Sequence, residues 1–434
     1  MRNILKILRP LFIITIFLEN LLLLAEVPRR PFLFKDARGE LAQARARGEK
    51  DVLLVIASMP GKNTNVIKLV NQLSGTIQYQ DNELDYLRVL MPIDSVQIIV
   101  GNKDIHSIDL SIHNRSRAFG RAFLPADLPT SKTLREQNVK QDRKSIWPPK
   151  LSEYPITNRY SPVKDIRAEK FLQSYPTYDG RGIKIAMIDM NTDPLLPELQ
   201  YAKSIDGKDI PKIFAYGSAI DARVDDDGRW LKMNDTVEAL SRKFVYKEKE
   251  YVAPKNGLFR IAQLNEFVVD SLALYGSSIE KDLNRDGNPK GSSRLFTVIW
   301  DKKSNNVWVD TDQDLDFSDE KRLTDFDTRQ EFGVFGKDDP NTDVRESIAF
   351  AVQIIKDQNL VALNMGKERH ATLVVGAALG SKGVNGRFDG VAPGAQLVNI
   401  AEGGSAYGQI ESPIISVKKY GADVVYFEHS SNIT

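Results

Sequence analysis

Short, almost wholly apolar segments alternate with helix-like segments in two stretches of this 434-residue chain. The first stretch contains IKIAMID at 183–189. The second runs from 345 to 427 and contains the strand-like RESIAFAVQII, NLVALN and DVVYF and the helix-like HATLVVGAALG. Apolar strands that alternate with helices are typical of a parallel sheet covered by helices on both faces. The sequence therefore predicts an α/β fold.

Two titratable residues lie at the ends of these segments. Asp189 ends a buried strand, where α/β proteins place binding and catalytic side chains. Asp is also a common helix N-cap, and the local sequence favours the cap. His370, one of only four histidines, precedes a helix-like run whose small residues, Gly376 among them, allow close packing. The local sequence alone is compatible with a general base or with an ordinary residue at a helix start.

The residues before 161 divide into three segments. Residues 1–25 combine a basic start with an apolar run broken by Glu19 and Asn20, which predicts an export signal or an N-terminal anchor. The alternative is a buried or interfacial helix. Residues 26–114 hold an α+β unit with its core at 51–114, and 115–160 have the Pro-rich, basic composition of an exposed linker. We therefore expect an exported protein that is secreted, periplasmic or membrane-anchored.

Residues 200–360 are polar and irregular, and we expect a β-rich insertion there with two acidic clusters. Alternate acidic residues around a turn can direct several oxygens at one Ca²⁺ ion, and without a cation they repel one another. Neither cluster is an EF-hand, because Leu315 and Lys321 occupy the glycine and glutamate positions of the second. A solvated acidic turn is the alternative. The candidate ligands are Asp282, Asn284 and Asp286, and Asp310, Asp312, Asp314 and Asp316.

The composition excludes several classes of function. Cysteine is absent, which excludes disulfides, thiolate chemistry and Cys-ligated zinc. The formal net charge is +1, so the overall charge gives no sign of a nucleic-acid partner or of binding to an acidic membrane surface. We expect membrane contact only through the N-terminal segment.

Several motifs, in their order along the chain, resemble those of the subtilisin-like serine proteases. IAMIDMNTD at 185–193 is similar to the family's VAVIDTGID, and HATLVVG at 370–376 is similar to its HGTHVAG. GVAPGA at 390–395 is the family's own sequence, and the lead-in YDGRGIKIAMID is also close to it. The resemblance covers about 161–199 and 361–434. It extends more weakly to 51–114, which resembles the inhibitory propeptide of the family.

The resemblance implies a partial subtilisin-like parallel sheet with flanking helices in 161–434, preceded by the propeptide-like α+β unit. It implies peptide-bond hydrolysis by an Asp/His/Ser triad, in which Asp189 orients His370 and His370 is the general base. No cofactor is required for that chemistry, and any Ca²⁺ would be structural. The implied partner is a polypeptide substrate or a full-length protease. The 181 positions between Asp189 and His370 imply a large insertion, which we place at about 200–360.

Several positions depart from the family's pattern. Asp-Thr-Gly is replaced by Asp189-Met190-Asn191, in which Asn tolerates a left-handed backbone. Ala371 and Leu373 replace a glycine and a second histidine, and Glu428-His429-Ser430 stands in place of the substrate-lining Ser-Leu-Gly.

A serine motif similar to GTSMA does not follow His370, and the oxyanion asparagine is missing as well. Ser405, Ser430 and Ser431 lack a supporting pattern. We therefore expect the N-terminal half of an endopeptidase, inactive by itself because it carries the Asp and His without the Ser. The alternatives are a non-catalytic binding or inhibitory protein derived from a protease, and a secreted calcium-binding module.

Overall fold

The chain divides into two compact units, Met1–His113 with Ser405–Tyr407, and the remainder. The expected export signal at 1–25 and linker at 115–160 lie outside the residues that the structure describes. Among the described helices, none combines the length and the apolar character needed to cross a membrane. This computed structural model describes residues 33, 35–111, 163, 166–219, 230–266, 282–284, 286, 293–337, 347–366, 369–381, 389–401 and 406–427.

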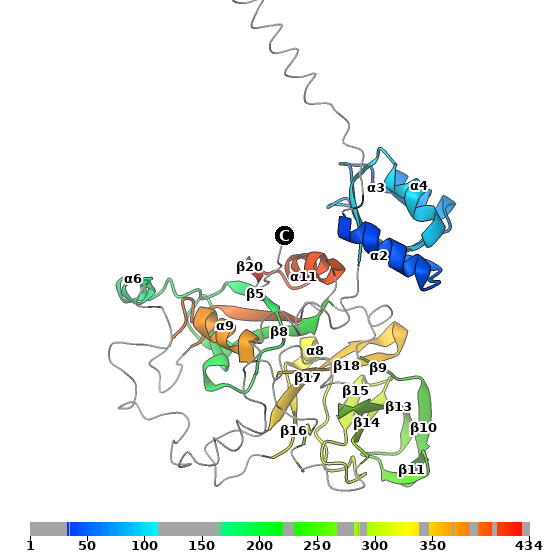
Figure 1. Cartoon of the computed structure of the whole chain (residues 1–434). Helices are drawn as coiled ribbons and strands as arrows, with labels where there is room; N and C mark the ends of the chain where they lie inside the picture. The colour runs from blue at the N-terminus through cyan, green and yellow to red at the C-terminus, as the bar shows by residue number, and fades with distance from the viewer. Residues whose placement is uncertain are drawn as a thin grey trace, which may run out of the picture. The chain divides into compact units, whose positions relative to one another are not determined.

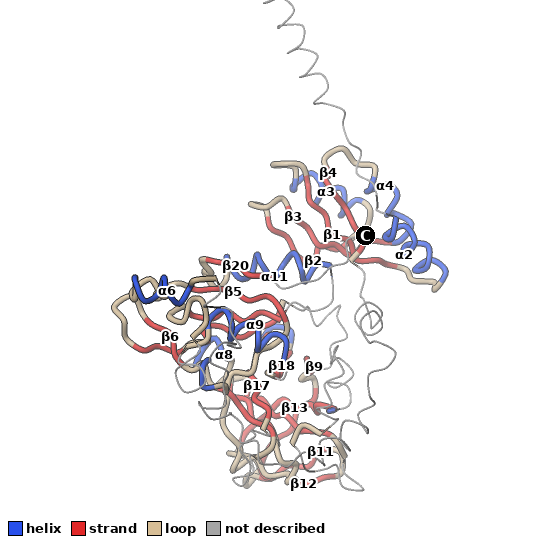
Figure 2. The backbone as a smooth tube through the Cα atoms, turned by 60° about the vertical axis from the view of Figure 1, so that its left-hand side comes forward, coloured by secondary structure: helices blue, strands red, loops and turns tan. Residues whose placement is uncertain are grey.

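The first unit is an α+β fold built on an antiparallel sheet of order β2-β3-β1-β4 (Figure 2). Val52, Leu54 and Ile56 alternate along β1, so they share one face of the sheet, and they join apolar residues from three helices in a single core. Its elements are α2 (Lys35–Ala46), β1 (Asp51–Ser58), α3 (Asn63–Gln72), β2 (Thr76–Asp81), β3 (Tyr86–Pro92), η1 (Ile93–Ser95), α4 (Val96–Val100) and β4 (Ile105–Leu110).

The second unit contains the predicted parallel sheet, of order β20-β5-β19-β8 (Figure 1). Its strands are β5 (Lys184–Asp189), β8 (Ile213–Ser218), β19 (Gln396–Ala401) and β20 (Val424–Phe427). All three strand pairings are parallel, and β5 and β19 run in register from Lys184↔Gln396 to Asp189↔Ala401. The α/β prediction is confirmed, but the expected strands in RESIAFAVQII and NLVALN are not part of this sheet, because they pair antiparallel with each other in a different one. β8 falls within the residues assigned to the insertion, yet it is a strand of this sheet.

Helices cover the two faces of the parallel sheet. Met187 packs in one apolar core with Val375 and Leu379 of α9, and its neighbour Ile188 packs in another with Ile415 of α11. Both faces are therefore buried, which explains why IKIAMID is apolar without alternation. The helices and short segments around this sheet are α6 (Ala168–Ser174), η3 (Pro197–Leu199), β6 (Tyr201–Lys203), β7 (Asp209–Pro211), α9 (Arg369–Leu379) and α11 (Ala406–Lys418).

Between β8 and α9 the described chain is mostly antiparallel strand, in the lower part of Figure 1. One sheet has the order β10-β13-β14-β15 and another β16-β17-β18-β9, and β11 and β12 form a hairpin. The elements are β9 (Trp230–Lys232), β10 (Asp235–Ala239), β11 (Lys243–Tyr246), β12 (Lys249–Val252), β13 (Gly257–Asn265), β14 (Leu295–Asp301), β15 (Asn306–Val309), α8 (Phe326–Arg329), β16 (Phe332–Phe335), β17 (Ile348–Ile355), η4 (Lys356–Gln358) and β18 (Leu360–Met365).

Candidate active site

Asp189 and His370 meet at the carboxyl end of the parallel sheet. Nδ1 of His370 lies 2.9 Å from Oδ2 of Asp189, and Oδ1 of the same carboxylate accepts a hydrogen bond from the Met190 amide at 2.6 Å. The Asp189 side chain is 8% exposed, whereas that of His370 is 54% exposed. A buried carboxylate thus holds one edge of an imidazole that is still open to solvent.

The structure shows where both residues lie. Asp189 is not a helix N-cap, because a turn follows β5 and the next helical element, η3, begins at Pro197. His370 does lie at a helix start, in the first turn of α9, and it also contacts Asp189. Asn191, whose side chain tolerates a left-handed backbone, does not adopt one. The turn therefore survives the loss of the family's glycine without the conformation that glycine favours.

Buried polar side chains fix the turn after Asp189. Asn399, fully buried in β19, accepts hydrogen bonds from the Thr192 amide at 2.9 Å and the Thr192 hydroxyl at 2.8 Å. The Thr372 hydroxyl on α9 accepts from the Asp193 amide at 3.0 Å, and the Tyr216 hydroxyl donates to the Thr192 carbonyl at 2.7 Å. The turn is thus tied to two neighbouring strands and to the helix that carries His370.

The segment Gly390–Ala395 secures the other end of α9. The amides of Gly390, Val391 and Ala392 donate to the carbonyls of Gly380, Ala377 and Ala378 at 2.6–3.2 Å. A Cβ atom on Gly390 would lie 2.7 Å from the Ala378 carbonyl carbon, so this close backbone approach requires glycine.

Lys212 adds a buried charge at the same end of the helix. Its Nζ donates to the carbonyls of Leu379 at 2.8 Å, Pro393 at 2.6 Å and Ala395 at 3.0 Å. The side chain is fully buried, and that burial lowers the pKa of Lys212 to about 7 against the opposing charges of Asp389 and Asp179. A cation at a helix C-terminus satisfies carbonyls that have no partner inside the helix.

Sequence reasoning did not identify Asn399, Thr372, Tyr216 or Lys212. Asn399 had a signal, since it interrupts the apolar strand segment LVNIA at 397–401. Lys212 had a weaker sequence signal, because it is a basic residue directly before the apolar strand β8.

Ser405, Ser430 and Ser431 lie outside the described residues, as do Glu428 and His429. Of the substituted positions near His370, Ala371 is fully buried, whereas Leu373 is 65% exposed.

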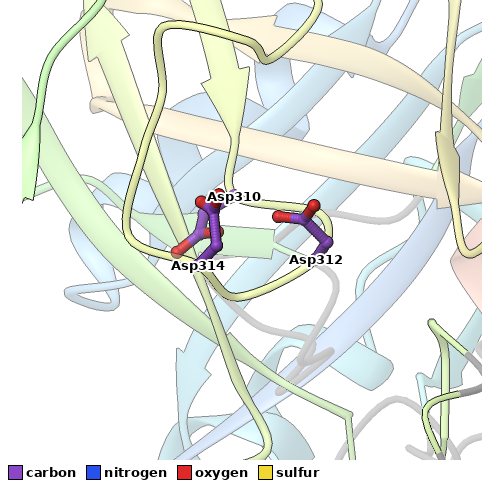
Figure 3. A group of neighbouring side chains, drawn as sticks. All are labelled: Asp310, Asp312 and Asp314. Carbon is purple, nitrogen blue, oxygen red and sulfur yellow. The ribbon is translucent and has the colours of Figure 1, made fainter.

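The two acidic clusters have different structures. In the first, the Asp286 amide donates to Oδ1 of Asp282 at 3.1 Å and to Oδ1 of Asn284 at 3.4 Å, and these contacts are exposed. In the second, one carboxylate oxygen each from Asp310, Asp312 and Asp314 lies within 4.8 Å of the others (Figure 3). Asp316, the fourth expected ligand of that cluster, instead accepts a hydrogen bond from the Ser318 amide at 2.7 Å.

Comparison with known proteins finds tripeptidyl-peptidase 2 and pyrolysin among the relatives. The chain is 27% identical to tripeptidyl-peptidase 2 of Oryza sativa subsp. japonica over 319 residues, which is 61% of this chain and 23% of the relative. It is 23% identical to tripeptidyl-peptidase 2 of Arabidopsis thaliana over 339 residues, 64% of this chain and 24% of the relative. Pyrolysin of Pyrococcus furiosus is 22% identical over 329 residues, 71% of this chain and 21% of the relative.

These relatives are subtilisin-like peptidases of the S8 type. The chain spans less than a quarter of the length of each. A crystal structure of tripeptidyl peptidase 2 aligns with a TM-score of 0.40 and 18% identity, over 59% of this chain and 24% of that one. No family model matches the chain.

Proposed function

We propose that the chain belongs to the subtilisin-like serine peptidases, as its relatives do, and that Asp189 and His370 form the orienting and general-base pair of a peptide-hydrolysing site. The observation that carries the proposal is the 2.9 Å contact between a carboxylate that is 8% exposed and an imidazole that is 54% exposed. A polypeptide is the proposed substrate.

The geometry fits the separate roles that the aspartate and the histidine have in a serine protease. A hydrogen bond from Nδ1 of His370 to Asp189 leaves the lone pair on Nε2, where it can accept the proton of a nucleophilic hydroxyl. Once protonated, the imidazolium is stabilised by the adjacent carboxylate. Asp189 itself is held, because its second oxygen accepts from the Met190 amide.

The sequence contains no recognisable motif for the serine nucleophile of such a site. A GTSMA-like motif is absent after His370 in the sequence. We therefore propose that the chain contributes the aspartate and the histidine, and that by itself it does not hydrolyse peptides. Removing the nucleophile of such a triad lowers kcat by about 10⁶-fold, which leaves only weak residual catalysis.

The histidine tautomer tests the proposed roles without requiring activity. ¹⁵N-histidine spectra of the full chain should show His370 protonated at Nδ1 and unprotonated at Nε2 when it is neutral. Asp189→Asn should shift this equilibrium towards the Nε2-protonated form, because the amide replaces an acceptor that favours Nδ1–H. His370→Ala assigns the signal. A wild-type His370 protonated at Nε2 would contradict the general-base role.

Turnover of a fluorogenic peptide separately tests the proposal that the chain by itself does not hydrolyse peptides. The purified chain should release no fluorophore above the rate of His370→Ala. Activity that this variant abolishes would show that a nucleophile lies within these residues, while leaving the roles of Asp189 and His370 intact.

A further inference from the structure

Asn399 is a buried polar side chain whose neighbours in strand β19 are apolar. Leu397, two residues earlier, packs in the same core as Val375 and Leu379 of α9. Because side chains alternate along a strand, Asn399 lies on that same face, which is covered by the helix that carries His370. A carboxamide buried there is costly unless it is hydrogen-bonded, so the fold must supply its partners.

The hydrogen-bond partners of Asn399 lie in the turn after Asp189. Its Oδ1 accepts from the Thr192 amide at 2.9 Å and from the Thr192 hydroxyl at 2.8 Å. Its Nδ2 donates to the Met190 carbonyl at 3.4 Å. A carboxamide oxygen has two lone pairs, and both are used here. One side chain from a neighbouring strand thus bridges the backbone on the two sides of Asn191.

Four successive peptide groups follow Asp189, and a side chain holds each of them. The first donates the Met190 amide hydrogen to Oδ1 of Asp189 at 2.6 Å. Asn399 holds the second through the Met190 carbonyl and the third through the Thr192 amide. The Thr372 hydroxyl on α9 accepts the amide hydrogen of the fourth at 3.0 Å. Asn399 therefore connects the peptide group that fixes Asp189 to the one that is tied to α9.

The residue enclosed by this turn does not help to hold it. Asn191 is 1% exposed, and neither its Nδ2 nor its Oδ1 has a hydrogen-bond partner among the described residues. A carboxamide buried without partners destabilises the folded state. The family pattern has glycine at this position, with no side chain to bury. The hydrogen bonds of Asn399 therefore offset a cost that Asn191 introduces in this chain.

We propose that Asn399 is a positioning residue for the pair of Asp189 and His370, and that it acts through the turn without touching the imidazole. This inference rests on the proposed function of the pair, in which a fixed carboxylate orients the imidazole. Without Asn399 the peptide groups on either side of Asn191 can rotate, and the carboxylate that the Met190 amide holds loses its fixed direction. The contact that weakens is the one of 2.9 Å between Nδ1 of His370 and Oδ2 of Asp189.

¹⁵N-histidine spectra of the full chain, recorded well below its Tm, test this role. Asn399→Ala removes all three hydrogen bonds. The ratio of Nδ1-protonated to Nε2-protonated His370 should then fall about tenfold, as expected if the contact with Asp189 weakens by the worth of one hydrogen bond. Thr192→Val removes only the hydroxyl donor and should lower the ratio less. If Asn399→Ala does not fold, Thr192→Val carries the test.

Thr297→Val is the matched control for a general loss of stability. Thr297 is 1% exposed, and its hydroxyl is hydrogen-bonded to the Tyr251 hydroxyl at 3.2 Å. The same chemical change is thus made at a buried threonine whose hydroxyl partner lies on β12. Thr297→Val should lower the Tm and leave the tautomer ratio of His370 unchanged.

A purely structural Asn399 would behave like this control, with a lower Tm and an unchanged tautomer ratio in every variant that folds. That result overturns the positioning role and leaves the general-base role of His370 intact, as does an equal change of the ratio in Thr297→Val. A wild-type His370 protonated at Nε2 would contradict both roles.

Discussion

Lys212 contributes a buried ammonium group to the C-terminal end of the helix that carries His370. Lys212→Met keeps the length of the side chain but leaves the carbonyls of Leu379, Pro393 and Ala395 without their donor. We expect a loss of about 1–3 kcal/mol in the free energy of unfolding at pH 7, because unpaired buried carbonyls cost more than the relieved desolvation of one charge. Urea unfolding of both proteins measures it.

Lys212 also predicts that the free energy of unfolding changes with pH in a defined direction. Burial lowers the pKa of Lys212 to about 7 in the folded protein, against an ordinary value of 10.5 for lysine. Between these two pH values the unfolded chain binds more protons than the folded one, so the stability of the wild type rises with pH. The slope approaches about 1 kcal/mol per pH unit. Lys212→Met should lack this component, and identical slopes in the two proteins from pH 7 to 9 would contradict it.

For single residues, the sequence predicted those that lie in recognisable motifs. It missed those whose hydrogen bonds form only in the folded structure. Asp189 and His370 were found because two short motifs carry them, although they are 181 positions apart. Asn399 and Lys212 were missed because their roles depend on backbone groups that only the fold brings near. A hydrogen bond from Lys212 to the Leu379 carbonyl, 167 positions away, has no local pattern.

At the scale of elements, helix α9 is held at both ends and by its buried Val375, but its glycine has space beside it. Gly376 lies within α9, and a Cβ atom added there would meet nothing within 4 Å. The expected close packing at this glycine is therefore wrong. Alanine loses less backbone freedom on folding than glycine, so Gly376→Ala should raise the free energy of unfolding by about 0.5–1 kcal/mol.

At Gly366 the same glycine-to-alanine change should lower the free energy of unfolding instead of raising it. A Cβ atom there would lie 2.2 Å from the Thr192 carbonyl oxygen and 2.5 Å from Pro194 Cδ, so the turn after Asp189 would have to move. Gly366→Ala should cost about 1–3 kcal/mol and should disturb the ¹⁵N signals of His370. Chemical denaturation of both variants tests the pair, and equal effects at Gly366 and Gly376 would contradict the packing described for α9 and the turn.

The elements themselves were predicted to different degrees. The parallel strands β5, β19 and β20 followed from apolar runs, and α9 followed from its helical spacing. The helix α4 did not, because VQIIV at 96–100 is too short for a period of 2 or 3.6 to be distinguished. That β8 joins the parallel sheet was also not predicted, since the distance along the chain from β8 to β19 hides their pairing.

At the scale of the whole molecule, the two compact units have separate apolar cores. Leu54, fully buried, belongs to the core of the first unit, and Phe350, 1% exposed, belongs to a core of the second. Units with their own cores unfold as separate cooperative transitions unless the interface between them is large and apolar. We therefore expect two transitions in calorimetry of the full chain.

Substitutions in each core assign these transitions. Leu54→Ala should lower the stability of the first unit by about 2–5 kcal/mol and shift only one transition. Phe350→Ala should shift only the other. The first unit should be the one that melts at the lower temperature, because a unit of roughly 80 residues buries a smaller fraction of its surface than one several times larger. If calorimetry instead shows a single transition that both substitutions shift equally, the two units unfold together. In that case the first unit could not fold before the sheet that carries Asp189.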